Sequence, residues 1–131
     1  MKKSVLLAVL FIVAMTIVSC KKDGSEESFG KPETTTEVQK TEDLGASIFN
    51  GKGACIACHK PDVKLVGPSL QDIAKIYKEK NGDMVTFLKG EGEPIVDPTQ
   101  YAVMKANFAI TKNFSEEELK ALEAYVYSHL K

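Results

Sequence analysis

The sequence contains no arginine and no tryptophan, and it has only two histidines and three cysteines among 131 residues. Its formal net charge is −1, so it lacks the basic excess that is typical of nucleic-acid-binding proteins. It also lacks internal repeats, a glycine-rich phosphate loop and any convincing alternation of apolar and polar residues. We therefore expect no nucleic-acid partner and no β-sheet, and electrostatic docking to a partner must use lysine.

The longest apolar run, Val5 to Val18, is too short to span a bilayer comfortably. Together with the lysines that precede it, this run predicts a signal peptide over residues 1–19. It ends at Ile17-Val18-Ser19-Cys20, which resembles the lipobox of bacterial lipoproteins. The resemblance implies that Cys20 becomes the first mature residue and carries the lipid. The alternative is an ordinary signal peptide in which this cysteine is incidental.

The composition changes after the apolar run. Residues 20–42 are rich in Lys, Asp, Glu, Ser, Thr and Gly, with few large apolar side chains. Such a segment cannot bury enough surface to offset the entropy lost on ordering, so we expect a lipidated, flexible polar tether. The compact domain is then residues 43–131, a length at which protein side chains alone form a marginal core.

The most specific motif is Cys55-Ile56-Ala57-Cys58-His59. A C-x-x-C-H run is the attachment signature of a c-type haem, in which each thiol adds to a vinyl group and the histidine binds the iron. A thioredoxin-like redox pair normally follows a strand in a βαβ unit, which is missing here. A zinc site needs more ligands than Cys20 and His129 can supply. We therefore predict one covalently attached haem c, with His59 as the fifth iron ligand.

The domain offers two candidates for the sixth iron ligand, Met84 and Met104. A thioether suits this position because it favours ferrous iron. Met84 lies on the apolar face of a predicted helix, where a methionine usually packs in a core. Met104 follows a proline-containing loop 45 residues after His59, which leaves enough chain to reach the far side of the ring. We favour Met104, with Met84 as the alternative.

Helical patterns account for most of the domain. The predicted helices are a short amphipathic one over 44–49, one capped by Ser69 and ended by Asn81-Gly82, one begun by Asp83 and ended by Gly90, one or two turns within 100–108, and a last helix opened by the capping box Ser115-Glu116-Glu117-Glu118. Residues 61–68 and 91–98 are predicted loops. We expect an all-α fold of four to five helices around one haem.

The order of these features resembles the class I cytochromes c, particularly the small bacterial ones. The resemblance covers about residues 43–131 and includes Val66-Gly67-Pro68-Ser69-Leu70 and a methionine late in the chain. It implies the cytochrome c fold. It also implies that the Pro68 carbonyl accepts a hydrogen bond from His59, and that Asn107 hydrogen-bonds the sulfur of Met104. The departures are that no proline follows Met104 and that no tryptophan is present to contact a haem propionate.

The resemblance further implies that the first and last helices cross closely, with Gly45 and Phe49 meeting Tyr125. Four lysines flank the haem-bearing segments and are candidates for a ring around the exposed haem edge, although simple solvation is the usual role of such side chains. They are Lys52, Lys60, Lys64 and Lys105. His129 lies in the last turn of the final helix, where a cationic imidazole suits the helix dipole.

With both axial positions filled, we expect a membrane-tethered monohaem electron carrier, not an enzyme, with no small-molecule substrate. The expected location is the cell envelope, on a lipid anchor facing the periplasm. The expected partners are a quinol-oxidising complex and a terminal oxidase or periplasmic reductase. The rival is a catalytic or sensing haem protein in which Met104 is unbound. A distal arginine or second histidine would favour that rival, but the domain has no arginine and His129 is nearly terminal.

Overall fold

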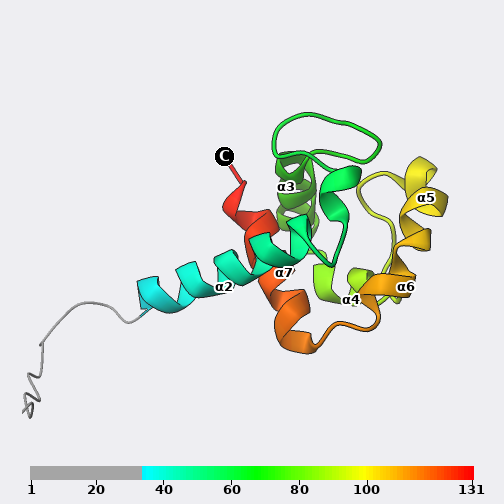
Figure 1. Cartoon of the computed structure of the whole chain (residues 1–131). Coiled ribbons are helices and arrows are strands. Elements are labelled where there is room, and N and C mark those ends of the chain that lie inside the picture. The colour runs from blue at the N-terminus through cyan, green and yellow to red at the C-terminus, as the bar shows by residue number, and fades with distance from the viewer. Residues whose placement is uncertain (1–33) are drawn as a thin grey trace, which may run out of the picture. The chain divides into compact units, whose positions relative to one another are not determined.

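The computed structural model of the chain describes residues 34–131 and is all-α in that range (Figure 1). No strand occurs there, and His59 and Lys64 form one isolated antiparallel bridge. This confirms the all-α prediction. The predicted signal peptide and Cys20 lie outside the described residues. The elements are α2 (Thr34–Asn50), η1 (Cys55–Ala57), α3 (Leu70–Lys80), α4 (Met84–Leu88), η2 (Pro98–Gln100), α5 (Tyr101–Ala106), α6 (Phe108–Thr111) and α7 (Glu116–Ser128).

No helix between Thr34 and Lys131 combines the length and the apolar character that a membrane span requires.

The predicted helix boundaries are confirmed where a capping residue sets them. The Ser69 hydroxyl accepts a hydrogen bond from the Asp72 amide at 3.1 Å, and Asn81 ends the same helix in the left-handed region at φ 50°. Asp83 accepts from the Thr86 amide at 2.8 Å, and its hydrogen bonds to Thr86 lower the pKa of the Asp83 carboxyl. Ser115 forms the predicted capping box with α7. These side chains satisfy amides that the first helical turn leaves unpaired.

The first helix begins earlier than expected. Residues 34–42 continue α2 toward the N-terminus, so the prediction of a flexible tether is wrong for that stretch. No proline or glycine interrupts the chain between Thr34 and Leu44, and extending a helix that is already formed costs little. The helix count also exceeds four to five, because the chain after residue 100 divides at Asn107 into two short helices.

Helices α2 and α7 cross at a glycine (Figure 1). A Cβ atom on Gly45 would lie 2.0 Å from the Ala121 carbonyl oxygen and 2.7 Å from the Cβ of Tyr125. Beside this contact, the Phe49 and Tyr125 rings pack with their centroids 5.3 Å apart. The predicted meeting of the first and last helices is confirmed, and it depends on the absence of a side chain at position 45.

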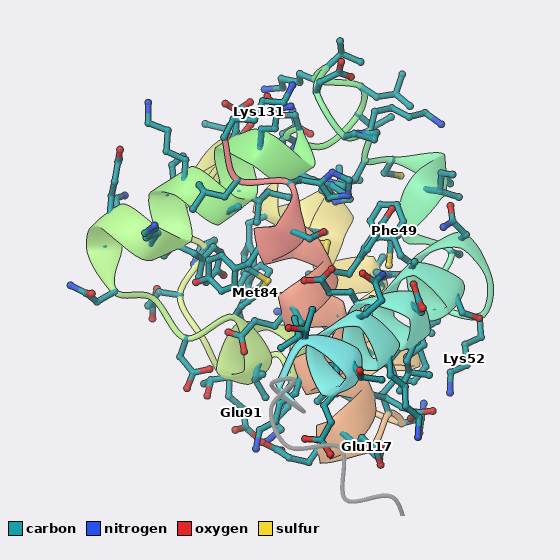
Figure 2. All side chains as sticks on the ribbon, turned by 90° about the vertical axis from the view of Figure 1, so that its left-hand side faces the viewer. Phe49, Lys52, Met84, Glu91, Glu117 and Lys131 are labelled. Carbon is teal, nitrogen blue, oxygen red and sulfur yellow. The ribbon has the colours of Figure 1, made fainter. Side chains whose placement is uncertain are left out.

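The core lies where α2, α3, α4 and α7 meet. Phe49 and Met84 are buried between the helices, whereas Lys52 and Glu117 project outward (Figure 2). Apolar side chains from the four helices form one buried cluster: Ile48, Phe49, Leu70, Ala74, Tyr77, Met84, Leu122 and Val126. The residues of α5 are not part of this cluster, so one side of the core is left to border the site described next.

Gly45→Ala should destabilise the protein even though alanine is the better helix former. The intrinsic helix propensity of alanine exceeds that of glycine by up to about 1 kcal/mol, but the added methyl group would overlap the backbone of α7. We expect a net loss of about 1–3 kcal/mol in the free energy of unfolding, measured by urea denaturation. Ser47→Ala, at an exposed position of the same helix, is the matched control. A more stable Gly45→Ala variant would show that the helices do not cross at this residue.

Candidate functional site

An apolar cavity of about 350 Å³ lies between the core and α5. Its volume falls within the range of small-molecule and cofactor sites. One wall comes from the cysteine–histidine motif and the loop after it, and the opposite wall from the residues around η2 and α5. The core helices form the remainder. The lining residues used below are Cys55, Cys58, His59, Val66, Gly67, Pro68, Tyr77, Met84, Asp97, Gln100, Tyr101, Val103, Met104 and Asn107.

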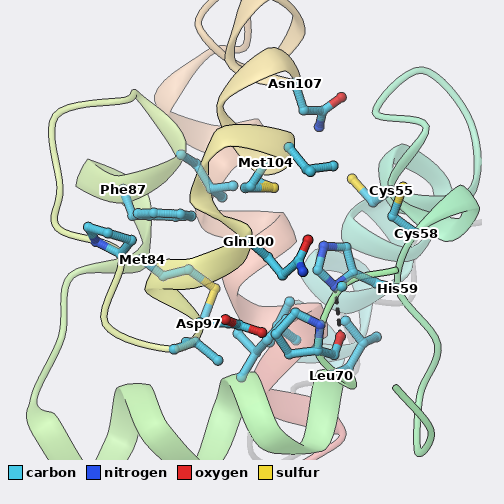
Figure 3. Close-up of a pocket in the computed structure, with 18 of the residues that line it drawn as sticks. Cys55, Cys58, His59, Leu70, Met84, Phe87, Asp97, Gln100, Met104 and Asn107 are labelled. Carbon is cyan, nitrogen blue, oxygen red and sulfur yellow. Dashed lines mark hydrogen bonds between the residues drawn. The ribbon is translucent and has the colours of Figure 1, made fainter. Parts of the chain in front are cut away.

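The motif at residues 55–59 forms one tight turn, which directs its three reactive side chains toward the cavity. The amide of Cys58 donates to the Cys55 carbonyl at 3.1 Å, and the amide of His59 donates to the same oxygen at 3.0 Å. The chain enters this turn through Ala54, which has a left-handed φ of 53°. Because the turn is helical, Cys55, Cys58 and His59 all border the same cavity (Figure 3).

The His59 ring is held in one orientation. Its Nδ1 lies 2.7 Å from the Pro68 carbonyl oxygen, and since a carbonyl only accepts, Nδ1 carries the proton. The neutral ring then has its lone pair on Nε2, which is free to bind a metal. Gly67 closes the other side of the ring, because a Cβ there would lie 2.4 Å from Cε1 of His59. The hydrogen bond implied by the resemblance is present.

The two cysteines are free thiols in the structure. Burial raises the pKa of the Cys55 thiol, with a smaller opposing effect from a backbone hydrogen bond. A neutral thiol is expected at pH 7, whereas redox-active and metal-binding cysteines depend on the thiolate. Among residues 34–131, no three His, Cys, Asp or Glu side chains gather as a metal-binding group. The zinc and thioredoxin-like alternatives therefore gain no support from the site.

Both candidate methionines border the cavity, but in different ways. Met84 begins α4, is 3% exposed and belongs to the core cluster. Met104 projects from α5, is half-buried and faces the cysteines and His59 from the opposite wall (Figure 3). An imidazole on one wall and a thioether on the other are the two donors that a six-coordinate haem iron needs. The site therefore fits the predicted haem c.

Asn107 follows α5 as its C-cap residue and lines the cavity. Its hydrogen bond to the Met104 sulfur, which the resemblance implies, stays a prediction. Sequence reasoning missed Asp97 and Gln100, which also line it. Gln100 precedes Met104 by four residues, so helical spacing was a usable signal for that residue. Nothing local marks Asp97. Its hydrogen bonds to Thr99 and then to Lys64 lower the pKa of the Asp97 carboxyl.

The four lysines expected around the cavity do not behave alike. Lys52 forms an ion pair with Glu118 and lies over the Phe114 ring, with its Nζ 4.7 Å from the ring centroid. Lys64 pairs with Asp97 at 2.9 Å. The other two, Lys60 and Lys105, are absent from the ion pairs of residues 34–131.

His129 caps the end of α7 and is not among the described residues that line the cavity. Its ring packs edge-on against Tyr125 with the centroids 4.9 Å apart, so it serves the crossing of α2 and α7. Tyr77, in contrast, does line the cavity. It is buried in the core, and that burial raises the pKa of its hydroxyl. Both side chains therefore have packing roles, whereas the sequence predicted for His129 only a favourable position at the end of the helix dipole.

The comparisons with known proteins agree with this geometry. The family model described as cytochrome c matches residues 42–129. Cytochrome c-552 from Nitrosomonas europaea is 50% identical over 40 residues, which are 30% of this chain and 38% of that protein. Cytochrome c-551 from Pseudomonas denitrificans is 40% identical over 62 residues, which are 41% of this chain and 73% of that protein. The chain thus spans well under half of the first relative and most of the second. It belongs to the cytochrome c family.

Proposed function

We propose that this protein is a monohaem electron carrier, tethered to a membrane by a lipid on Cys20 and exposed to the periplasm. The cofactor of the family is one covalently attached haem c. The observation that carries the proposal is the placement of His59 and Met104 on opposite walls of one apolar cavity. A site that supplies both axial ligands keeps no vacant position for a substrate, so the proposed role is not enzymatic.

In this proposal each lining residue has a defined task. Cys55 and Cys58 form the thioether links, His59 Nε2 and the Met104 sulfur bind the iron, and Asn107 hydrogen-bonds that sulfur. Pro68 keeps the imidazole in its tautomer and orientation through the 2.7 Å hydrogen bond. When bound, the haem supplies an iron that alternates between the ferrous and ferric states.

The apolar walls of the cavity also exclude water and exogenous ligands. His59 is the sole histidine among the described lining residues, and none of them is a lysine. The described lining residues therefore offer neither a second histidine nor a cation that could activate peroxide or hold a bound gas, and their one carboxylate, that of Asp97, is paired with Lys64. This favours electron transfer over the rival catalytic or sensing role.

The surface around the cavity offers a place for redox partners. Val66 and Val103 line the cavity from opposite walls and are still 47% and 52% exposed, so the mouth lies between them. Neighbouring exposed apolar side chains are Ile56, Val63 and Leu65. Lys60 and Lys105 provide positive charge at the same walls. We propose that a quinol-oxidising complex and a terminal oxidase or periplasmic reductase dock here, through small and transient interfaces.

Haem should be bound covalently through Cys55 and Cys58. After acid–acetone extraction the colour should stay with the polypeptide, and the intact mass should exceed that of the processed chain by one haem. The double variant Cys55→Ala/Cys58→Ala should lose the colour and most of the folded protein, because the cavity is then unfilled. Cys20→Ala is the control and should keep its haem. Colour that moves into the solvent from the wild-type protein would refute the covalent link.

Met104 should be the sixth iron ligand. The ferric protein should show the weak far-red charge-transfer band of an iron–methionine bond, and Met104→Ala should lose it. The same variant should bind imidazole or carbon monoxide readily and have a lower reduction potential, because a thioether stabilises ferrous iron.

Met84→Leu is the matched control for Met104→Ala. It should keep the band and cost at most about 1.5 kcal/mol in the free energy of unfolding, since leucine has a similar volume. A band that survives in Met104→Ala and disappears in Met84→Leu would assign the ligand to Met84 instead.

Cys20 should be the lipidated mature N-terminus. Cys20→Ala should abolish incorporation of radiolabelled fatty acid and shift the protein from the detergent phase to the aqueous phase, because one lost anchor removes most of the membrane affinity. Ser19→Ala keeps a small residue before the cysteine and should be processed normally. Unchanged phase partitioning of Cys20→Ala would point to an anchor other than this cysteine.

A further inference from the structure

We propose that the ion pair between Lys64 and Asp97 joins the two walls of the cavity and positions the segment that carries Met104. This inference rests on the proposed function, since it assigns a positioning role toward the sixth iron ligand. The Lys64 Nζ lies 2.9 Å from Oδ2 of Asp97. The lysine side chain is 59% exposed, whereas that of the aspartate is only 15% exposed and lines the cavity. The pair therefore lies between solvent and the cavity.

Each end of the pair is tied to the backbone of one proposed axial ligand. On one wall, Lys64 forms the isolated bridge with His59. On the opposite wall, Asp97 directly precedes η2, which continues without a break into α5 and Met104. The Asp97 carbonyl accepts from the Gln100 amide at 3.1 Å, and its Oδ1 accepts from the Thr99 hydroxyl at 2.5 Å. Through these hydrogen bonds the Asp97 carboxylate is connected to the start of α5, the helix that carries Met104.

Few other contacts restrain that segment. Lys80 donates to the Ile95 carbonyl at 2.9 Å, and the Tyr101 ring packs against Phe87 and Phe108. These contacts attach the segment to the core helices and not to the histidine wall. Among the hydrogen bonds and ion pairs of residues 34–131, the Lys64–Asp97 pair alone joins residues 54–68 to residues 94–107. Its loss should let the two walls separate more often.

The pair also sets the charge at the cavity wall. Asp97 is the sole acidic residue among the described lining residues, and Lys64 offsets its charge. An unbalanced carboxylate near the iron stabilises the ferric form, and an unbalanced ammonium stabilises the ferrous form. Removing either partner should therefore loosen the segment in the same way but move the reduction potential in opposite directions.

A double-mutant cycle on the haem-loaded protein tests this. Lys64→Gln and Asp97→Asn keep the size of the side chains, and asparagine can still accept from Thr99. Each single variant should bind imidazole to the ferric iron about two- to fivefold more tightly, as expected for loss of a partly exposed ion pair that keeps Met104 in place. The double variant should match the single ones instead of multiplying their effects. The potential should fall in Lys64→Gln, rise in Asp97→Asn and return toward wild type in the double variant.

Lys75→Gln is the control, because it removes an exposed lysine of the same charge from α3. It should leave the imidazole affinity unchanged. Two results would refute the positioning role of the pair even in a protein that shows the far-red band. One is single variants that bind imidazole with the affinity of the wild type. The other is a double variant whose change in affinity is the product of the two single changes. A wild-type protein without that band would refute Met104 ligation, and with it the positioning role.

Discussion

The central cavity is the constraint on which the rest of the domain depends. Without a group that fills it, the cavity of about 350 Å³ would leave its apolar lining in contact with water that enters between Val66 and Val103. Small domains have a total stability of only roughly 5–15 kcal/mol, so the loss of the apolar contacts of a whole cavity is a large fraction of it. The helices therefore need a resident group in their centre. A haem c that is covalently attached provides one that cannot dissociate, and this explains how so short a chain keeps a fold with a hollow core.

The two walls of the cavity are built in different ways, and the difference suits an electron carrier. The histidine wall is rigid, because the ring of His59 is fixed by the Pro68 carbonyl and by the backbone at Gly67. The methionine wall is formed by the short helix α5, which packs mainly against its neighbours η2 and α6. In the proposed ligation, a fixed strong ligand and a weaker ligand on a short helix would give an iron whose coordination depends on how well the second wall is held. The proposed role of the Lys64–Asp97 pair is to hold that wall.

Much of the fold and of the motif could be predicted from the sequence, because the decisive signals are local. Ser69, Asp83 and Ser115 cap their helices through hydrogen bonds within one turn, and C-x-x-C-H carries its chemistry in five consecutive residues. The contact of Gly45 with α7 came from the family resemblance and not from periodicity. The helix caps and the Gly45 contact are confirmed, whereas the roles of Cys55, Cys58 and His59 in holding the haem stay predictions.

The rest depends on contacts between segments that are far apart in the chain. Asp97 was missed because its partner, Lys64, lies 33 residues away and neither residue stands in a recognisable motif. The early start of α2 was missed because a polar, threonine-containing stretch has a weak helical signal. It becomes helical as an extension of the packed part of the helix, which periodicity alone does not reveal.

In the proposed electron carrier the iron keeps the same two protein ligands in both oxidation states. Iron K-edge X-ray absorption on the ferric and the ferrous protein tests it most directly, because it counts the sulfur and nitrogen neighbours of the metal. One sulfur and five nitrogen neighbours are expected in both states, with little change in their distances. A sulfur neighbour that is missing in either state, or a site that loses one ligand on reduction, would contradict the electron-carrier account.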